Sequence, residues 1–221
     1  MEDPRRFESG SVGHGRAISF FDAIYGFAIT LLVVNIDPPA PEYWGSLPVL
    51  LDSGLGTNLF AFTLSFIVIA VFWWSNHRAL SGLAAIDPPT VFASIIGIFF
   101  VVLIPFATQA IGDPGTSTTA LAVSVYAAVI AFAVLAQMAV YAVARSRGLM
   151  DPMPSARRVR LEFIDAAITP FVFLVSIPIA FLAGADAGRW TWASLLVLGP
   201  ISGMLVKRAL RNESAPSAPS A

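Results

Sequence analysis

The chain contains no cysteine and only two histidines. The lack of cysteine excludes disulfide bonds and thiol chemistry and removes the commonest ligand of structural zinc. Two histidines are too few for a histidine-based metal site. Charged residues make up only 12% of the 221 residues, where a soluble domain has about a quarter. The surface must therefore face something other than water, and lipid is the obvious partner.

Several functional motifs are also missing. The sequence has no glycine-rich phosphate loop, no H-E-x-x-H and no Ser/His/Asp constellation at readable spacing. We therefore expect no catalytic residue, no cofactor and no bound metal, and a membrane enzyme is the least favoured function. The net charge of −1 gives no basic excess for nucleic acid. The T-V-G-Y-G sequence of ordinary potassium-channel filters is absent as well.

What the chain does have is six long apolar runs, and its mean hydropathy is +0.76. A helix needs about 20 residues to cross a bilayer core of ~30 Å. The runs cover residues 17–36, 55–76, 91–111, 120–143, 164–183 and 190–206, with Asp-Pro pairs or glycines between them. The sequence thus predicts an all-α integral membrane protein with a six-helix transmembrane domain over residues 17–208. Residues 42–54 are interpreted as a short interfacial segment.

The two ends of the chain are expected to lie outside the bilayer. Residues 1–16 are charged and lack an apolar core, so no cleavable signal peptide is predicted and the first helix directs insertion. Residues 209–221 are too poor in apolar side chains to fold and are predicted to be a disordered tail.

The distribution of positive charge predicts the topology. If the N-terminus is cytoplasmic, twelve of the thirteen lysines and arginines fall on the cytoplasmic side, and only Arg189 lies outside. Positively charged loops resist translocation. Both termini are therefore predicted to be cytoplasmic.

One ionisable residue lies inside the first predicted helix. Asp22 is about one and a half turns into it, Arg16 is at its mouth, and His77 at the end of the second helix falls in the same leaflet. An acid inside a span is costly and asks for a partner. We favour a structural or gating network of Asp22 and His77 over simple helix packing. Glu162 and Asp165 are interpreted as residues near a helix N-terminus, where acids are stabilised by the helix dipole.

Helical spacing separates two faces of the first helix. Ser19, Ala23, Phe27, Thr30 and Val34 fall within an arc of roughly 80° at ~100° per residue. Asp22 lies about 100° from the middle of this stripe. A stripe of this kind is more often a helix-packing face than a pore lining, and a mid-span threonine can simply bond its own backbone one turn back.

Three segments resemble one family. The run Arg16–Asp22, followed by Ala28–Val34, resembles the R-x-x-x-F-S-D motif and the A-I-T-L-L-V run of the transmembrane protein 175 family, which comprises the endolysosomal potassium channel and its prokaryotic relatives. Residues 74–77 are similar to its W-x-x-H, and residues 103–108 to its L-x-P-F-x-T. The resemblance covers residues 16–110, and beyond them only helix count and topology agree.

The resemblance implies a tetramer of six-helix subunits in which the first helix of each subunit lines a central pore. Phe27 then occupies the constriction and Thr30 the position that contributes to cation selectivity, with a transient potassium ion near Thr30. Val34 and Ala23 complete the pore lining. The family's bracing network is carried by Arg16, Phe20, Asp22, Trp74 and His77.

Two positions depart from the family pattern. Phe21 replaces the motif serine and removes a hydroxyl group from the network. Phe27 replaces an aliphatic residue, so four phenylalanines around one axis would close the pore more completely.

Our leading hypothesis is a homotetrameric, potassium-selective cation channel in the plasma membrane of a prokaryotic cell, with potassium ions, other copies of the chain and the lipid bilayer as partners. A proton-coupled transporter or proton leak that uses Asp22, His77 and Asp165 as a relay is the alternative. A membrane scaffold without transport is the third possibility.

Overall fold

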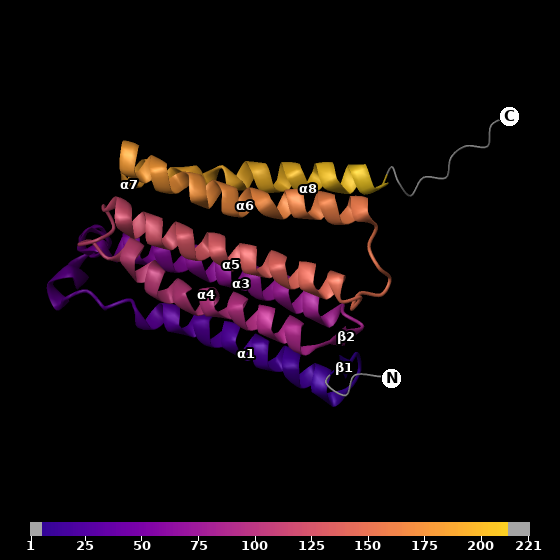
Figure 1. Cartoon of the computed structure of the whole chain (residues 1–221). Helices are drawn as coiled ribbons and strands as arrows, with labels where there is room; N and C mark the ends of the chain where they lie inside the picture. The colour runs from indigo at the N-terminus through magenta and orange to yellow at the C-terminus, as the bar shows by residue number, and fades with distance from the viewer. Residues whose placement is uncertain (1–5, 212–221) are drawn as a thin grey trace.

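The computed structural model describes residues 6–211 of the chain. Within them it is a bundle of long helices (Figure 1): α1 (Val12–Val34), α3 (Gly56–Ser81), α4 (Pro88–Gly112), α5 (Ala120–Ser146), α6 (Ala156–Ala183), and the pair α7 (Ala185–Ala193) and α8 (Leu195–Arg211). Six helical stretches of the described chain are long and apolar enough to cross a membrane. The predicted all-α fold with six transmembrane helices is confirmed.

Polar side chains define where several helices begin. The side chains of Ser11, Asp87, Thr119 and Ser155 each accept a hydrogen bond from the backbone N–H three residues later, at the starts of α1, α4, α5 and α6. These N-caps satisfy backbone donors that the first helical turn leaves without a partner. They fix the starts of four helices that carry almost no amphipathic signal.

Successive spans run in opposite directions, so α1 begins and α8 ends at the same end of the bundle, on opposite sides of it (Figure 1). We call this the ribbon end, because β1 (Phe7–Glu8) and β2 (Ala85–Ile86) pair there as an antiparallel ribbon. The opposite, or loop, end carries the short turns η1 (Pro41–Gly45), α2 (Leu47–Leu50) and η2 (Leu51–Leu55), together with α7.

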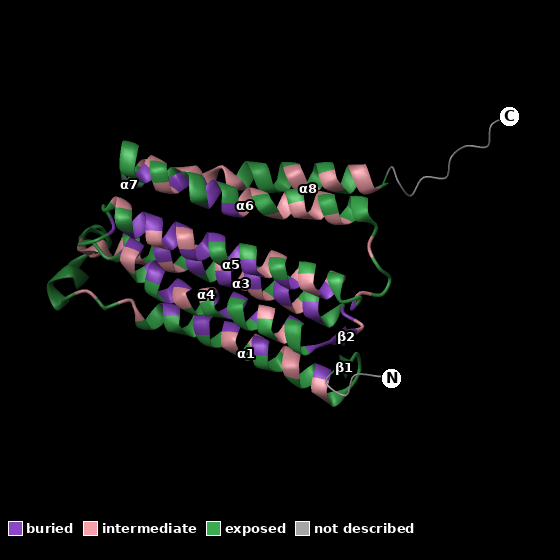
Figure 2. Ribbon diagram, viewed as in Figure 1, coloured by how far each residue is buried: buried purple, intermediate pink, exposed green. Residues whose placement is uncertain are grey.

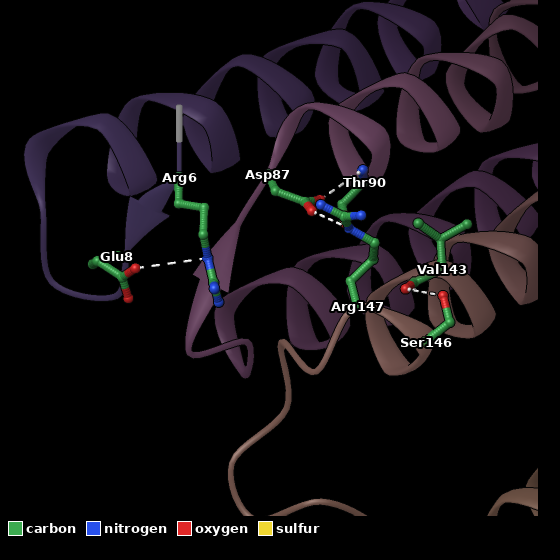
Figure 3. A network of polar contacts seen from close by, with 7 residues as sticks. All are labelled: Arg6, Glu8, Asp87, Thr90, Val143, Ser146 and Arg147. Atoms are coloured by element: carbon green, nitrogen blue, oxygen red, sulfur yellow. Dashed lines mark hydrogen bonds and ion pairs between the residues drawn. The ribbon is translucent and has the colours of Figure 1, made fainter. Parts of the chain in front are cut away.

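The ribbon end ties three separate segments together. Ser9 N–H donates to the Ala84 carbonyl at 2.8 Å, and Ala84 N–H donates to the Leu149 carbonyl at 2.8 Å. Beside these bonds the buried Asp87 carboxylate accepts from Thr90 and from Arg147 Nε, the latter at 2.6 Å (Figure 3). The start of α1 is thereby linked to the α3–α4 loop and to the end of α5. This ribbon was not predicted from the sequence.

Burial is concentrated where α4 and α5 meet the other helices, while the outer faces of the bundle are exposed (Figure 2). The exposed positions include many large apolar residues, among them Phe92, Phe99 and Phe106 at seven-residue intervals on α4. A water-soluble monomer rarely shows apolar patches of this extent. The outer surface therefore suits lipid or another protein.

The helices differ in extent from the predicted spans. Residues 156–163 already belong to α6, and the last span is two helices that meet at Ser194. A hydropathy search stops at charged residues, yet Arg157 and Arg158 are good helix formers. Residues 209–211 belong to α8 rather than to a disordered tail, and residues 12–16 belong to α1. Residues 1–5 and 212–221, where the rest of the terminal predictions fall, lie outside the described part.

Candidate functional site

Helix α1 has one face packed against the rest of the chain and one face uncovered. Phe21, Tyr25, Ala28 and Leu32 are at most 2% exposed and pack against the other helices. The predicted stripe lies on the uncovered side: Phe27 is 69% and Val34 is 71% exposed, and Ser19, Ala23 and Thr30 are exposed as well. The stripe is thus not a packing face within the chain.

The Thr30 hydroxyl donates to the Phe27 carbonyl at 2.9 Å. This is a backbone bond of the kind that a mid-span threonine is expected to make. Because the hydroxyl hydrogen is used inside the helix, the oxygen lone pairs are left on the exposed side. Thr30 can therefore offer an acceptor, and not a donor, to whatever faces the stripe.

Asp22 is held by two side chains of α3. Trp73 Nε1 donates to Asp22 Oδ1 at 2.9 Å, and His77 Nδ1 lies 2.9 Å from Asp22 Oδ2. The two partners are four residues apart, so they occupy neighbouring positions on one face of α3. The predicted association of Asp22 with His77 is present in the structure, and it joins α1 to α3 in the half of the bundle nearer the ribbon end.

The other members of the predicted network are placed differently. Trp73, rather than Trp74, contacts Asp22, because Trp74 lies one position further around α3. Trp74 is 55% exposed, with the Arg78 guanidinium 6.0 Å from its ring centroid. Arg16 is exposed and forms no ion pair with the described residues. Phe20 is 57% exposed and packs edge-on against Phe21.

Two further contacts of α1 were not predicted from the sequence. Gln137 Nε2 donates to the Tyr25 hydroxyl at 3.3 Å and to the Phe72 carbonyl at 3.0 Å. Asn35 Nδ2 donates to the Pro105 carbonyl at 3.1 Å. These bonds join α1 to α3, α4 and α5. In the sequence, the position of Tyr25 three residues after Asp22 indicates only that both residues lie on nearby parts of one helix face. It does not indicate which residues Tyr25 contacts.

The threonine of the L-x-P-F-x-T segment has a structural role. The buried Thr108 hydroxyl lies 2.6 Å from Ser65 Oγ, and Ser65 lies 3.1 Å from the Tyr126 hydroxyl. Burial of these three groups is compatible with stability because each has a partner. The chain of hydroxyls connects α4, α3 and α5.

Glu162 and Asp165 do not lie at a helix N-terminus, because α6 begins at Ala156. Glu162 accepts from Tyr141 at 2.7 Å and from Arg158 at 2.8 Å. Asp165 accepts from Ser202 of α8. These bonds correct the helix-dipole interpretation, and none of them connects the two acids to Asp22.

The described residues contain no group of three histidine, aspartate or glutamate side chains that could hold a metal ion. The arrangement around α1 is therefore an exposed apolar stripe with one hydroxyl acceptor, beside a braced acid. Its exposed stripe can face an ion pathway or pack against another molecule.

Residues 16–105 match the family model described as "Endosomal/lysosomal potassium channel TMEM175". A potassium channel of Streptomyces collinus is 28% identical over 179 residues, which cover 76% of this chain and 86% of that protein. A potassium channel of Chamaesiphon minutus is 32% identical over 133 residues, or 58% of this chain and 62% of that protein.

A solved structure shares the fold. The crystal structure of a lysosomal potassium-selective channel TMEM175 homolog from Chamaesiphon minutus superposes with a TM-score of 0.63 at 23% identity. The match covers 89% of this chain and 97% of that one. The matched family model, the relatives and the shared fold identify this chain as a relative of the TMEM175 potassium channels, which are ion channels and not enzymes.

Proposed function

We propose that this chain is the subunit of a homotetrameric, potassium-selective cation channel whose pore is lined by α1. The observation that carries the proposal is the uncovered stripe of α1, which includes Ala23, Phe27, Thr30 and Val34. The opposite face of the same helix is fully packed within the subunit. Potassium is proposed as the ion because the bacterial relatives are named potassium channels.

In this proposal Phe27 forms the constriction. Four copies of an apolar ring around one axis exclude water and so oppose passage of a hydrated ion. No charge in the ring is needed to close the pore. The size of the side chain at residue 27 should therefore control throughput.

Thr30 follows Phe27 by about one helical turn, on the side of the loop end. Its hydroxyl hydrogen is directed to the Phe27 carbonyl, so four hydroxyl oxygens would present lone pairs to the axis. Such acceptors replace part of the hydration shell of a potassium ion. Asp22 lies off the stripe, and its bonds to Trp73 and His77 would brace α1 against α3 without reaching the ion.

We place the ribbon end of the bundle in the cytoplasm and the channel in the plasma membrane of a prokaryotic cell. Of the described lysines and arginines, Arg189 alone lies on the helices of the loop end. Its guanidinium donates to the Ser117 carbonyl and lies 3.5 Å from Asp186. The positive-inside rule favours this orientation.

The test is cation flux into liposomes that contain the purified chain, under potassium and sodium gradients. We expect potassium flux to exceed sodium flux. Phe27→Ala should raise flux and weaken discrimination, because it widens the apolar ring. Ile29→Ala removes an apolar side chain of the same helix that is partly packed in the core, and it should change flux least.

The proposal is wrong if Phe27→Ala and Ile29→Ala have equal effects on flux. It is equally wrong if a cysteine at residue 27 resists small aqueous thiol reagents while one at residue 29 reacts. The absence of native cysteines makes this labelling unambiguous.

A proton pathway is the second candidate, favoured by the direct contact of Asp22 with His77. The two candidates separate in liposomes under a pH gradient without potassium. Proton flux that Asp22→Asn abolishes and Phe27→Ala leaves unchanged would favour the proton pathway. Potassium flux that responds to Phe27→Ala would favour the channel.

A further inference from the structure

Two adjoining cavities lie in the half of the bundle nearer the ribbon end, between α3, α5 and α6. The outer cavity has a volume of about 820 Å³ and the inner one about 340 Å³. Both are lined by Ser75, Ala79, Tyr141 and Glu162, so they meet at these residues. Their sizes fall within the range of small-molecule sites.

The inner cavity has mostly apolar walls. Aliphatic and aromatic side chains of three helices line it, including Val71, Phe72, Val134, Met138, Phe163 and Ala166. None of these is charged, and the chain is a membrane protein. A hydrocarbon chain is the ligand that suits such walls.

Of the polar side chains that line the inner cavity, three have hydrogen-bonding groups without a partner among the described residues. Asn76 is only 6% exposed, and its Nδ2 has no partner among the described residues. The hydroxyls of Ser75 and Thr169 likewise make no hydrogen bond within the described chain, whereas Ser94 and Ser124 bond the carbonyl one turn back. A buried amide donor without a partner is costly. A ligand with acceptor oxygens would satisfy it.

The outer cavity adds a cation at the mouth. Arg78 lines it and forms no ion pair with any described carboxylate; its guanidinium lies over the Trp74 ring. The Glu162 carboxylate already accepts hydrogen bonds from Arg158 and Tyr141. The one other acid of the lining, Asp151, is exposed. The order from inside to outside is therefore apolar walls, hydrogen-bonding groups and a free positive charge.

We propose that these cavities bind one glycerophospholipid from the leaflet at the ribbon end. One acyl chain fills the inner cavity, the ester oxygens accept hydrogen bonds from Asn76 and Ser75, and the phosphate contacts Arg78. The site does not depend on the proposed channel activity. It lies against the turn of α3 that also carries Trp73 and His77, so a bound lipid would stabilise the segment that holds Asp22.

The test is lipid binding to the purified full-length chain, measured by native mass spectrometry with dioleoylphosphatidylglycerol and, separately, with oleate. Ala79→Trp places a large ring where the cavities meet. Ala167→Trp adds the same ring at an exposed position of α6 outside both cavities. We expect Ala79→Trp to weaken phospholipid binding at least about tenfold, a change that one or two lost hydrogen bonds would produce, while Ala167→Trp leaves it unchanged. Ala166→Phe, which fills the inner cavity from α6, should have the same effect as Ala79→Trp.

The headgroup assignment has its own variant. Arg78→Gln should weaken phospholipid binding about tenfold and leave oleate binding unchanged, because it removes one charge-assisted contact to phosphate. Equal binding by Ala79→Trp, Ala166→Phe and Ala167→Trp would overturn the site. Oleate binding as tight as phospholipid binding, insensitive to Arg78→Gln, would overturn the phospholipid as ligand. A change in the number of subunits with Ala79→Trp alone would show that another copy of the chain fills the groove, and would overturn the proposal.

Discussion

Asp22 of α1 contacts two side chains of α3. Each carboxylate oxygen has its own partner, Trp73 for Oδ1 and His77 for Oδ2. The pair of partners follows from helical spacing, since residues four apart share a face. Residues three apart are also neighbours on a helix, so spacing from His77 allows both Trp73 and Trp74, and the structure assigns the contact to Trp73. The family motif alone pointed to the neighbouring tryptophan.

We expect replacements of Asp22 and its partners to lower stability in a definite order. Asp22→Asn keeps an oxygen for Trp73, so it should cost less than Asp22→Ala, which leaves both partners unpaired. His77→Ala should also destabilise, at about 1–3 kcal/mol for one unsatisfied partner. The measurement is the thermal midpoint of the detergent-purified protein.

Two matched pairs serve as controls for this order. Trp73→Phe should lower the midpoint while Trp74→Phe does not, and the exposed Asp37→Asn should have no effect. Equal midpoints for Trp73→Phe and Trp74→Phe would remove the bracing role of Asp22.

Asp87 gives a prediction with a pH dependence. Its burial raises the pKa of the carboxyl, but the hydrogen bonds from Thr90 and Arg147 outweigh this effect and hold the pKa below its ordinary value. A carboxyl with a lowered pKa stabilises the folded state above its unfolded pKa of about 3.9, and this stabilisation is lost as the pH falls through the folded pKa. Asp87→Asn should therefore lower the thermal midpoint equally at pH 7 and pH 5.

The difference between wild type and Asp87→Asn should shrink once the pH falls below about 4. Arg147→Gln should likewise lower the thermal midpoint at pH 7 and pH 5, and less so below about pH 4, because it removes one of the bonds that lower the pKa of Asp87. The exposed Asp151→Asn is the control. A difference that grows as the pH falls would contradict the assignment.

At the scale of elements, what the sequence could predict depends on whether a feature repeats. The helices can be predicted from the sequence because each apolar run is long and hydrophobic enough to cross a membrane. The ribbon of Phe7–Glu8 and Ala85–Ile86 is invisible because strands of two residues have no periodicity. The cavities beside Asn76 could not be predicted from the sequence for another reason. They depend on how α3, α5 and α6 pack against one another. The stripe with Phe27 and Thr30 followed directly from spacing.

The hydrogen bond that links the α3–α4 loop to the end of α5, beside the ribbon, can be tested by removing its donor. Ala84→Pro deletes the N–H that donates to the Leu149 carbonyl and should destabilise the protein by about 1–3 kcal/mol. Ala40→Pro is a matched control, because Ala40 is exposed, has a φ of −58° and precedes Pro41. Chemical unfolding of both variants measures the difference. Equal stability of Ala84→Pro and Ala40→Pro would show that the bond from Ala84 to Leu149 contributes nothing.

At the scale of the whole molecule, the prediction concerns orientation. Asp52, Gly115 and Ala187 all lie at the loop end, and Gly148 and Met153 follow α5 at the ribbon end. Single cysteines at the first three positions should react with a membrane-impermeant thiol reagent added to intact cells. Those at Gly148 and Met153 should react only after the cells are opened. Labelling of Gly148 in intact cells, or protection at any of the first three positions, would invert or break the proposed topology.

The ribbon also sets an order of events during biosynthesis. Phe7 and Glu8 leave the ribosome first, yet their partners Ala85 and Ile86 emerge only after α1 and α3 have been made. The further bond from Ala84 to Leu149 must wait until α5 is complete. The N-terminal segment therefore has to remain unpaired at the membrane surface until α1 and α3 have been made. Nascent chains stopped before residue 85 should expose this segment to protease, and chains extended past residue 149 should protect it.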